Sequence, residues 1–404
     1  MIHRHHMPTE SAPRRTALFV ILFLLLSAFA SIPRFGEREN EHSPGVSDSD
    51  LYIEMARVFT GELKQFTKDY VAWQPHHYNR PCLPFLAGYF GKFLLGGNLR
   101  AAFSLINIVA ATVVALLLMK VVQRHRPEWQ LSWLPSVLFL TGFPQLNWGY
   151  HIFTDTLGYA TALSTACYAA WLIEQIGQTA PWNKSALSLH LTLLFASSSV
   201  AFLTRETAWF AVITAIWLVA KCPRVPHDLL KQGLIPFVLV LGKLPHVVYA
   251  YAYAVSGVPL KSSLSALLNW PYLFDFTVKT AVCFNLAWLL AVWGFLRAGG
   301  RSVPPLFTGW SVAALFYIGA GYYVNKIHLI GYPLRMSYAL FPSVYYGVTA
   351  LLEKRLSEQR RVPVAIAFFL VQYGINLVGL FLDPGRPGIK AADVLKSLRD
   401  FLSN

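Results

Sequence analysis

Charged residues are scarce in this chain of 404 residues. Asp, Glu, Lys and Arg make up 13% of it, about half of the roughly 25% that is usual in globular proteins, whereas 55% of the residues are hydrophobic. Long apolar runs recur along the chain. This composition excludes a soluble fold, a disordered chain and a nucleic-acid-binding domain. We therefore expect the net charge of +14 to reflect cytoplasmic loops and contacts with anionic lipid headgroups.

Cysteine is also rare, and its spacing is uninformative. Cys82, Cys167, Cys222 and Cys283 form no CxxC pair, which argues against a disulfide scaffold or a zinc site. No internal repeat of roughly 20–50 residues is visible. The sequence therefore predicts a single membrane domain over residues 1–382 with no attached soluble domain, followed by a short tail over 383–404.

Apolar segments of the length needed to cross a bilayer predict an all-α, polytopic membrane protein with about 11 transmembrane helices. A sequence at positions 28–30, Ala-Phe-Ala, resembles a signal-peptidase site, so the first segment is either a retained helix or a cleaved signal. In both cases the chain after Ile32 is expected outside. The candidate spans are 16–32, 101–119, 132–147, 152–173, 187–203, 207–220, 233–252, 273–296, 305–324, 334–352 and 363–382.

The segment 81–97 is apolar but contains two prolines, four glycines and Lys92. As a helix of about 16 residues it would cover only about 24 Å, less than the ~30 Å hydrocarbon core, so we expect it to lie at the outer interface. The distribution of Lys and Arg supports this topology, with 16 in the cytoplasmic segments and 3 in the short external loops. It places the N-terminus inside, one large extracytoplasmic loop over about 33–99, and the tail outside.

Under this topology the ionisable residues near membrane level gather on the outer side, where they are expected to form a site for an anionic, lipid-attached substrate. Arginine suits such a site because its guanidinium can hold two phosphate oxygens at once. Structural alternatives stay open. Ser47-x-x-Asp50 fits a helix capping box, Arg205 could simply pair with Glu206 or Asp155, and the Arg335 side chain could extend to the lipid headgroups without binding substrate. The group comprises Asp48, Asp50, His76, His77, Arg80, His151, Asp155, Arg205, Glu206, His328 and Arg335.

Several short motifs, in order, resemble the GT-C superfamily of integral-membrane glycosyltransferases. Asp48-x-x-x-Tyr52-x-x-x-Ala56 directly after the first helix is similar to the first-loop motif of that superfamily. Tyr78-Asn79-Arg80-Pro81 before an apolar helix resembles its protein mannosyltransferase and lipid A aminoarabinose transferase branches. Further along the chain, the matching motifs are Phe153-Thr154-Asp155, Leu203-Thr204-Arg205-Glu206, and Tyr332-Pro333-Leu334-Arg335 with Phe341-Pro342.

The resemblance implies transfer of a sugar from a polyprenyl-phosphate donor to an acceptor hydroxyl on a glycolipid, polysaccharide or protein. It implies that Asp48 is the general base, with Asp50 as the alternative, and that cations stabilise the departing phosphate. It also implies a bacterial inner membrane with an outward-facing site. The cations would be Arg80 and Arg335, with Arg205 third, and further substrate contacts would come from Tyr78, Asp155, Glu206 and His328.

The first loop departs from the best-known branches, because it carries Asp-x-Asp where they often have a paired acid. A divalent metal held by Asp48 and Asp50 therefore stays open. Two other functions also stay open: a lipid-linked glycan polymerase or ligase, and a transporter or flippase. The large loop after the first helix argues against the former, and the lack of a visible repeat argues against the latter.

Overall fold

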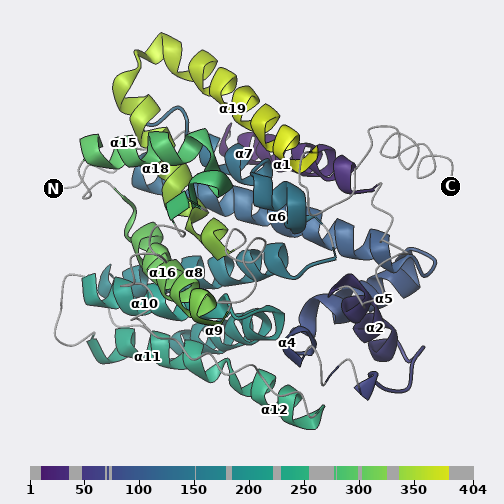
Figure 1. Ribbon diagram of the computed structural model, residues 1–404. Helices are drawn as coiled ribbons and strands as arrows, with labels where there is room; N and C mark the ends of the chain where they lie inside the picture. Colours follow the sequence, from purple (N-terminus) through teal and green to yellow (C-terminus); the bar gives the residue numbers. More distant parts are fainter. Residues whose placement is uncertain are drawn as a thin grey trace.

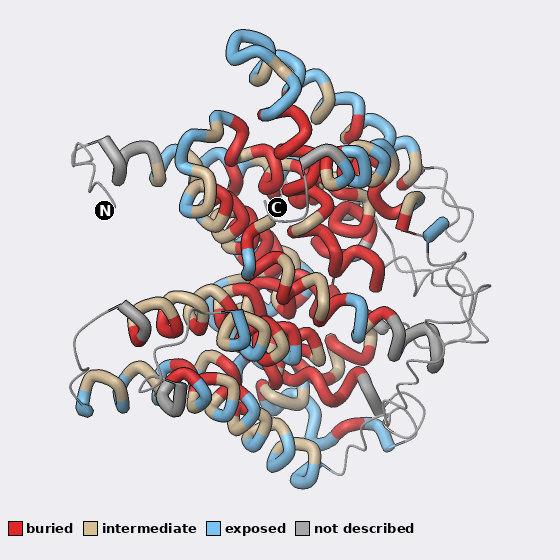
Figure 2. Tube along the Cα trace, turned by 90° about the vertical axis from the view of Figure 1, so that its left-hand side faces the viewer, coloured by how far each residue is buried: buried red, intermediate tan, exposed pale blue. Residues whose placement is uncertain are grey.

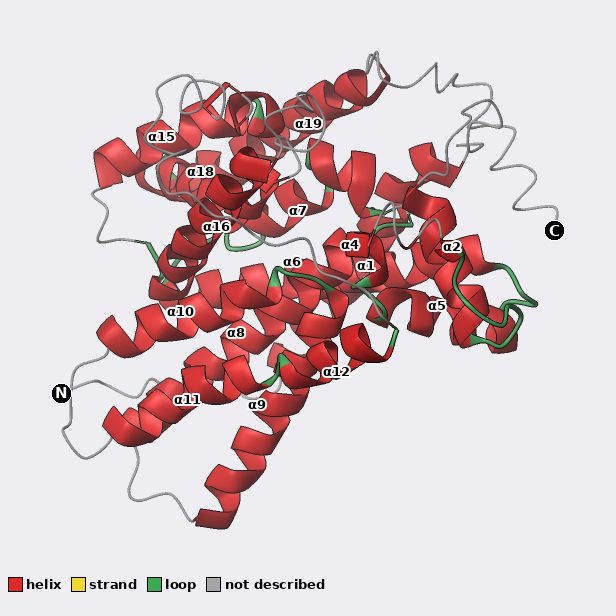
Figure 3. Cartoon of the chain, turned by 60° about the horizontal axis from the view of Figure 1, so that its bottom comes forward, coloured by secondary structure: helices red, strands yellow, loops and turns green. Residues whose placement is uncertain are grey.

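The computed structural model describes residues 11–35, 48–68, 71, 75–150, 152–178, 184–221, 229–253, 277–278, 280–298, 303–324 and 336–381. Within these ranges the chain forms helices, turns and loops, and no strand is present (Figure 3). The predicted all-α class is confirmed. Long helices run side by side, and short helices cover one end of them (Figure 1).

One layer of the protein is built around α6 (Leu99–His125), which packs against α1 (Ser11–Phe35) and α7 (Leu134–Leu140). The C-terminal helices complete this layer: α18 (Phe341–Arg355) packs on α15 (Leu286–Ala298), and α19 (Glu358–Phe381) contacts α7 and α18. A 3-10 turn, η4 (Tyr338–Leu340), leads into α18. The largest apolar core of the described residues lies among these helices.

The other layer consists of α8 (Asp155–Gln178), α9 (Lys184–Thr204), α10 (Ala208–Lys221), α11 (Leu229–Leu241), α12 (Leu244–Ala252) and α16 (Pro305–Val324). α8 packs against both α9 and α10, and α10 packs against α16. The contact between α6 and α8 joins the two layers. The start of α8 and the turn between α9 and α10 are therefore held in a rigid setting.

Three short helices cover one end of α6: α2 (Asp48–Phe59), α4 (Pro75–Tyr78) and α5 (Cys82–Leu94) (Figure 1). α5 contacts both α2 and α6. Gly96 and Gly97, with φ of 58° and 92°, turn the chain from α5 into α6, and the Asn98 side chain caps α6 by accepting a hydrogen bond from the Ala101 N–H at 3.0 Å. α5 confirms a separate helix within 81–97; at 13 residues it is about 20 Å long, and its position at the interface stays a prediction.

The outer faces of the helices are strongly apolar, and the buried residues lie inside (Figure 2). Large exposed apolar side chains of this kind suit contact with lipid, since a soluble monomer rarely shows them as a continuous surface. Representative ones are Leu25 and Phe29 on α1, Leu189 and Leu193 on α9, Leu296 on α15, and Leu370 and Val378 on α19.

Four described helical segments are long and apolar enough to cross a bilayer, and the predicted count of about 11 spans is not confirmed. The candidate span 132–147 is not one helix, because α7 has seven residues and a π-helical turn, η1 (Gln145–Gly149), follows it. The helix is interrupted at Thr141 and Gly142, where Pro144 has no N–H to donate to the Leu140 carbonyl four residues earlier. The four segments are Leu99–His125, Lys184–Thr204, Gln232–Ala252 and Glu358–Leu380.

Candidate active site

Arg80 occupies the turn between α4 and α5, and only 3% of the residue is exposed. Its Nη2 atom lies 2.6 Å from Oε1 of Glu206, which belongs to the turn between α9 and α10. Its Nη1 atom donates to the Tyr52 hydroxyl at 3.2 Å. Arg80 thus ties the first-loop helix α2 to a turn that lies more than a hundred residues further along the chain.

Arg205 is the neighbour of Glu206 in that turn and is 2% exposed. Its Nη1 atom lies 2.7 Å from Oδ1 of Asp155, the first residue of α8, and 3.4 Å from the Thr154 hydroxyl. Its Nη2 atom donates to the Tyr317 hydroxyl on α16 at 3.4 Å. A guanidinium so thoroughly surrounded has a fixed orientation.

Glu206 connects the two arginines. Its Oε1 atom accepts from Arg80, and its Oε2 atom lies 3.8 Å from Nε of Arg205. We call Arg80, Asp155, Arg205 and Glu206 the charge network; two positive and two negative charges make it formally neutral. Its members differ in exposure. The Glu206 side chain is 34% exposed, whereas those of Arg80, Arg205 and Asp155 are 4%, 2% and 8% exposed.

Burial alone would raise the pKa of Glu206, but the positive charges of Arg80 and then Arg205 lower it further than burial raises it. The net result is a pKa well below the usual value for a glutamate. Burial would likewise lower the pKa of Arg205, and Asp155 opposes this strongly enough to raise it. Both shifts favour the ionised forms of Glu206 and Arg205.

The depressed pKa of Glu206 predicts how stability depends on pH. In the unfolded chain Glu206 titrates near pH 4.3, so its ionised form stabilises the fold above that pH and this contribution is lost as the pH falls toward the folded-state pKa. The difference in melting temperature between the native protein and Glu206→Gln should be constant from about pH 5 to pH 8 and shrink below about pH 4. Thermal unfolding in detergent over this range measures it. A difference that shrinks with rising pH would contradict the assignment.

Helix α12 holds the backbone that leads to Arg80. Nε2 of His246 donates to the Asn79 carbonyl at 2.9 Å, and the Tyr249 hydroxyl donates to the Tyr78 carbonyl at 2.8 Å. The Tyr78 hydroxyl in turn donates to a carboxylate oxygen of Glu54 on α2. These contacts fix the turn from two sides, so they position Arg80 without touching its guanidinium.

Gly158, one turn into α8, allows Arg205 to lie close to that helix. A Cβ atom at this position would be 2.9 Å from the Thr207 hydroxyl oxygen and 3.0 Å from both Cβ and Cδ of Arg205. These distances are shorter than ordinary van der Waals contact. Any larger residue at position 158 must therefore displace Arg205 or its turn.

Gly158→Ala is accordingly expected to destabilise the protein by about 1–3 kcal/mol, the usual effect of overpacking, and to reduce the activity of the site. Gly233→Ala on α11 is a matched control, because a Cβ there meets no atom within 4 Å. It should be neutral or stabilise by up to about 1 kcal/mol. The measurement is the melting temperature of each variant in detergent. Equal melting temperatures would show that the turn carrying Arg205 can shift to accommodate the added methyl group without a cost in stability.

The predicted site residues can now be compared with the structure. Arg80, Asp155, Arg205 and Glu206 meet in one network, and Tyr78 lies in the turn that carries Arg80. Asp48 and Asp50 lie in the first turn of α2, which begins at Asp48 as the capping box predicts, and position 48 is one helical turn before Tyr52. The side chain of Asp48 and the whole of His328 and Arg335 lie outside the described residues. Among the side chains that the structure describes, no three His, Cys, Asp or Glu residues are placed to hold a metal ion.

Sequence reasoning missed the neutral partners of the two arginines. Tyr52 belongs to the first-loop motif, which marks it as a candidate site residue. Its hydrogen bond with Arg80, however, joins residues that are 28 positions apart in the sequence. Tyr317, His246 and Tyr249 lie in apolar helices with no motif around them. Aromatic residues are so frequent in this chain that nothing in the sequence distinguishes these three.

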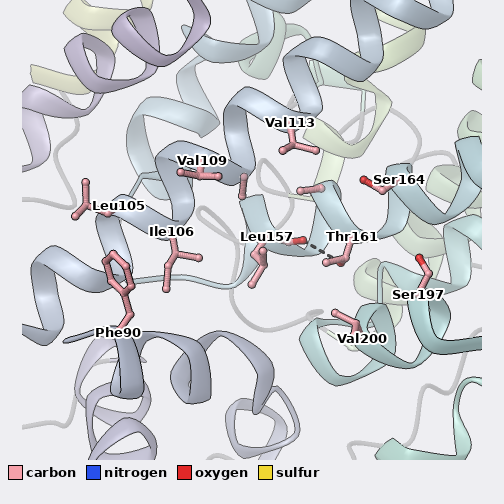
Figure 4. A pocket seen from close by; sticks show the side chains of 12 residues that line it. Phe90, Leu105, Ile106, Val109, Val113, Leu157, Thr161, Ser164, Ser197 and Val200 are labelled. Carbon is pink, nitrogen blue, oxygen red and sulfur yellow. Dashed lines mark hydrogen bonds between the residues drawn. The ribbon is translucent and has the colours of Figure 1, made fainter. Parts of the chain in front are cut away.

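An apolar groove of about 500 Å³ runs between α5, α6, α8 and α9 (Figure 4). None of the four residues of the charge network lines it. In the sequence, its wall on α8 starts at Leu157, two residues after Asp155, and its wall on α9 ends at Val200, five residues before Arg205. Phe90 of α5 lies at one end of the groove and Val113 of α6 further along it (Figure 4). Two of the helices that line it, α6 and α9, are long and apolar enough to span a bilayer.

No protein-family model matches the sequence, and no curated protein is similar to it in sequence. Solved structures are similar to it in fold. The oligosaccharyltransferase of Archaeoglobus fulgidus, solved with zinc and sulfate, superposes with a TM-score of 0.56 at 12% identity, covering 90% of this chain and 53% of its own. ArnT from Cupriavidus metallidurans superposes with a TM-score of 0.50 at 14% identity, covering 97% of this chain and 76% of its own.

These similarities show the fold. The chain shares its helical membrane-protein fold with these two proteins, and the fold expected from the sequence resemblance is confirmed. It spans about half the length of the oligosaccharyltransferase.

Proposed function

We propose that this protein is a membrane glycosyltransferase that moves a sugar from a polyprenyl-phosphate-linked donor to an acceptor hydroxyl on the outer face of the membrane. The observation that carries the proposal is the pair of buried arginines, Arg80 and Arg205, in a GT-C fold that also has an apolar groove between α5, α6, α8 and α9. A lipid phosphate needs both features together: cations for its phosphate and an apolar surface at membrane depth for its chain.

The reaction assigns a role to each predicted residue. Asp48, or Asp50 in its place, takes the proton of the acceptor hydroxyl, and the acceptor oxygen bonds to the anomeric carbon of the sugar. The bond from that carbon to the phosphate oxygen breaks, and the lipid phosphate leaves with the electron pair, which inverts the anomeric carbon. Arg80, Arg205 and Arg335 stabilise the charge that grows on the phosphate, as preorganised cations do in a site sheltered from water.

The remaining predicted residues support these groups. Tyr78 positions Arg80 through the contacts of its carbonyl and hydroxyl with Tyr249 and Glu54. Asp155 orients Arg205 through an ion pair of 2.7 Å. His328, which precedes α18 in the sequence, is proposed to contact the substrate. A metal at Asp48 and Asp50 is not needed for the steps above.

The test is transfer of labelled sugar from synthetic polyprenyl-phosphate donors by the purified protein, with a panel of sugars and with lipid and polysaccharide acceptors. Transfer above the level of an Arg80→Gln, Arg205→Gln double variant supports the proposal. If the protein instead moves donor lipid across a vesicle membrane without consuming it, the proposal is wrong and the protein is a flippase.

A further inference from the structure

The guanidinium of Arg80 is paired with a carboxylate of the protein itself. Oε1 of Glu206 lies 2.6 Å from Arg80 Nη2, the distance of a charge-assisted hydrogen bond. A donor phosphate that is to bind Nη2 of Arg80 needs the position that this carboxylate holds. Substrate and protein therefore compete for one cation.

The two acids of the charge network are held unequally. The Asp155 side chain is 8% exposed and lies 2.7 Å from Arg205. The Glu206 side chain is 34% exposed, and its buried Oε2 atom accepts no hydrogen bond, since it is 3.8 Å from Arg205. Of the two acids, Glu206 is therefore the less tightly held.

The charge balance favours an exchange. A sugar-phosphate-lipid diester carries one negative charge, as Glu206 does. When one replaces the other beside Arg80, Arg205 and Asp155, the buried group stays neutral, so the large energy of an uncompensated buried charge does not arise.

A second cation lies in the same part of the protein. Lys243, at the start of α12, has its Nζ atom 5.2 Å from the centre of the Phe202 ring. Phe202 lies on α9, three residues before Arg205. We expect Lys243 to offer an ionic partner to the displaced carboxylate.

We propose that Glu206 is a displaceable latch: its carboxylate stands in for the donor phosphate on Arg80, yields to that phosphate on binding, and returns to displace the lipid phosphate product after transfer. The latch rests on the proposed function and adds a role in product release. The product needs such a competitor, because a phosphate monoester carries up to two charges and would bind the arginines more tightly than the donor.

The experiment is equilibrium binding of a short synthetic polyprenyl phosphate to the purified full chain in nanodiscs. Glu206→Gln keeps the size of the side chain and removes its charge, so its competition for Arg80 is weakened. Affinity for polyprenyl phosphate should rise roughly tenfold or more, the equivalent of one lost charge-assisted hydrogen bond. Steady-state transfer should show a lower KM together with a lower kcat, because product leaves slowly, while the first turnover stays fast.

Glu206→Asp provides a second variant in case the loss of charge beside Arg80 prevents folding. It keeps the charge on a shorter side chain, which reaches Arg80 less well, so its affinity for polyprenyl phosphate should also rise, by a smaller factor. Glu174→Gln is the matched control: Glu174 is 42% exposed and pairs with Arg124 away from the network. Its binding should equal that of the native protein.

Arg80→Gln distinguishes the latch from the proposed function. If Arg80→Gln weakens binding and Glu206→Gln tightens it, both are supported. If Arg80→Gln weakens binding while both Glu206 variants bind equally or more weakly, the latch is wrong and the phosphate site stands. If Arg80→Gln binds like the native protein, the phosphate site is elsewhere and both proposals fail.

Discussion

Arg205→Met is expected to destabilise the protein by about 3–5 kcal/mol, a large fraction of the roughly 5–15 kcal/mol by which a folded protein is usually stable. Methionine fills the space of the arginine stem, so the loss is one of charge rather than of volume. It leaves Asp155, which is 8% exposed, without its closest cation at 2.7 Å. The measurement is the yield of monodisperse protein in detergent, together with its melting temperature.

A charge-balanced double variant separates stability from function. Arg205→Met combined with Asp155→Asn removes both charges of the buried pair, and pairs replaced in this way often cost little or nothing. Glu206 and Arg80 still balance each other. The double variant should recover most of the lost melting temperature and yet transfer sugar poorly, because a cation of the phosphate site is gone. Recovery of both properties would make Arg205 purely structural.

The sequence was sufficient to predict that Arg80, Asp155 and Arg205 gather. The unequal distribution of Lys and Arg between the loops set the sidedness of each segment, and a membrane confines polar residues of one side to one plane. Helix α5 was predictable for a related reason, since its apolar run is too short for a span. Such statements depend on rules that act along the chain.

The pairing inside the site could not be predicted. Arg80 could have paired with Asp155 as well as with Glu206, and the choice depends on how α9 and α10 pack against α8 and on the backbone contacts of α12 with the turn at 78–80. These contacts join positions far apart in the sequence. Pro144 was visible in the sequence, but the hydrophobicity of 132–147 led to the prediction of one continuous span. In the structure the missing N–H of Pro144 matters more than this hydrophobicity, and the helix is interrupted.

Helix α2 carries the other decisive prediction. Asp48→Asn keeps the size of the side chain but cannot accept a proton. If Asp48 is the general base, sugar transfer should fall by roughly 10²-fold or more, while donor lipid still binds. The measurement is initial rate together with equilibrium binding of the donor.

If Asp48 only stabilises the start of α2, Asp48→Asn should transfer sugar at the native rate, so the rate distinguishes the two roles. Its melting temperature should scarcely change, because an acid in the first turn of a helix contributes only about 0.3–1 kcal/mol through the helix dipole. Glu62→Gln is a matched control, because Glu62 follows α2 and lies 4.0 Å from Arg57 on an exposed surface.

Asp50→Asn should cost less activity than Asp48→Asn, unless Asp50 is the base and the two results exchange. Native rates in both aspartate variants would leave Asp48 and Asp50 as helix-capping residues and would move the search for the base to Asp155 and Glu206.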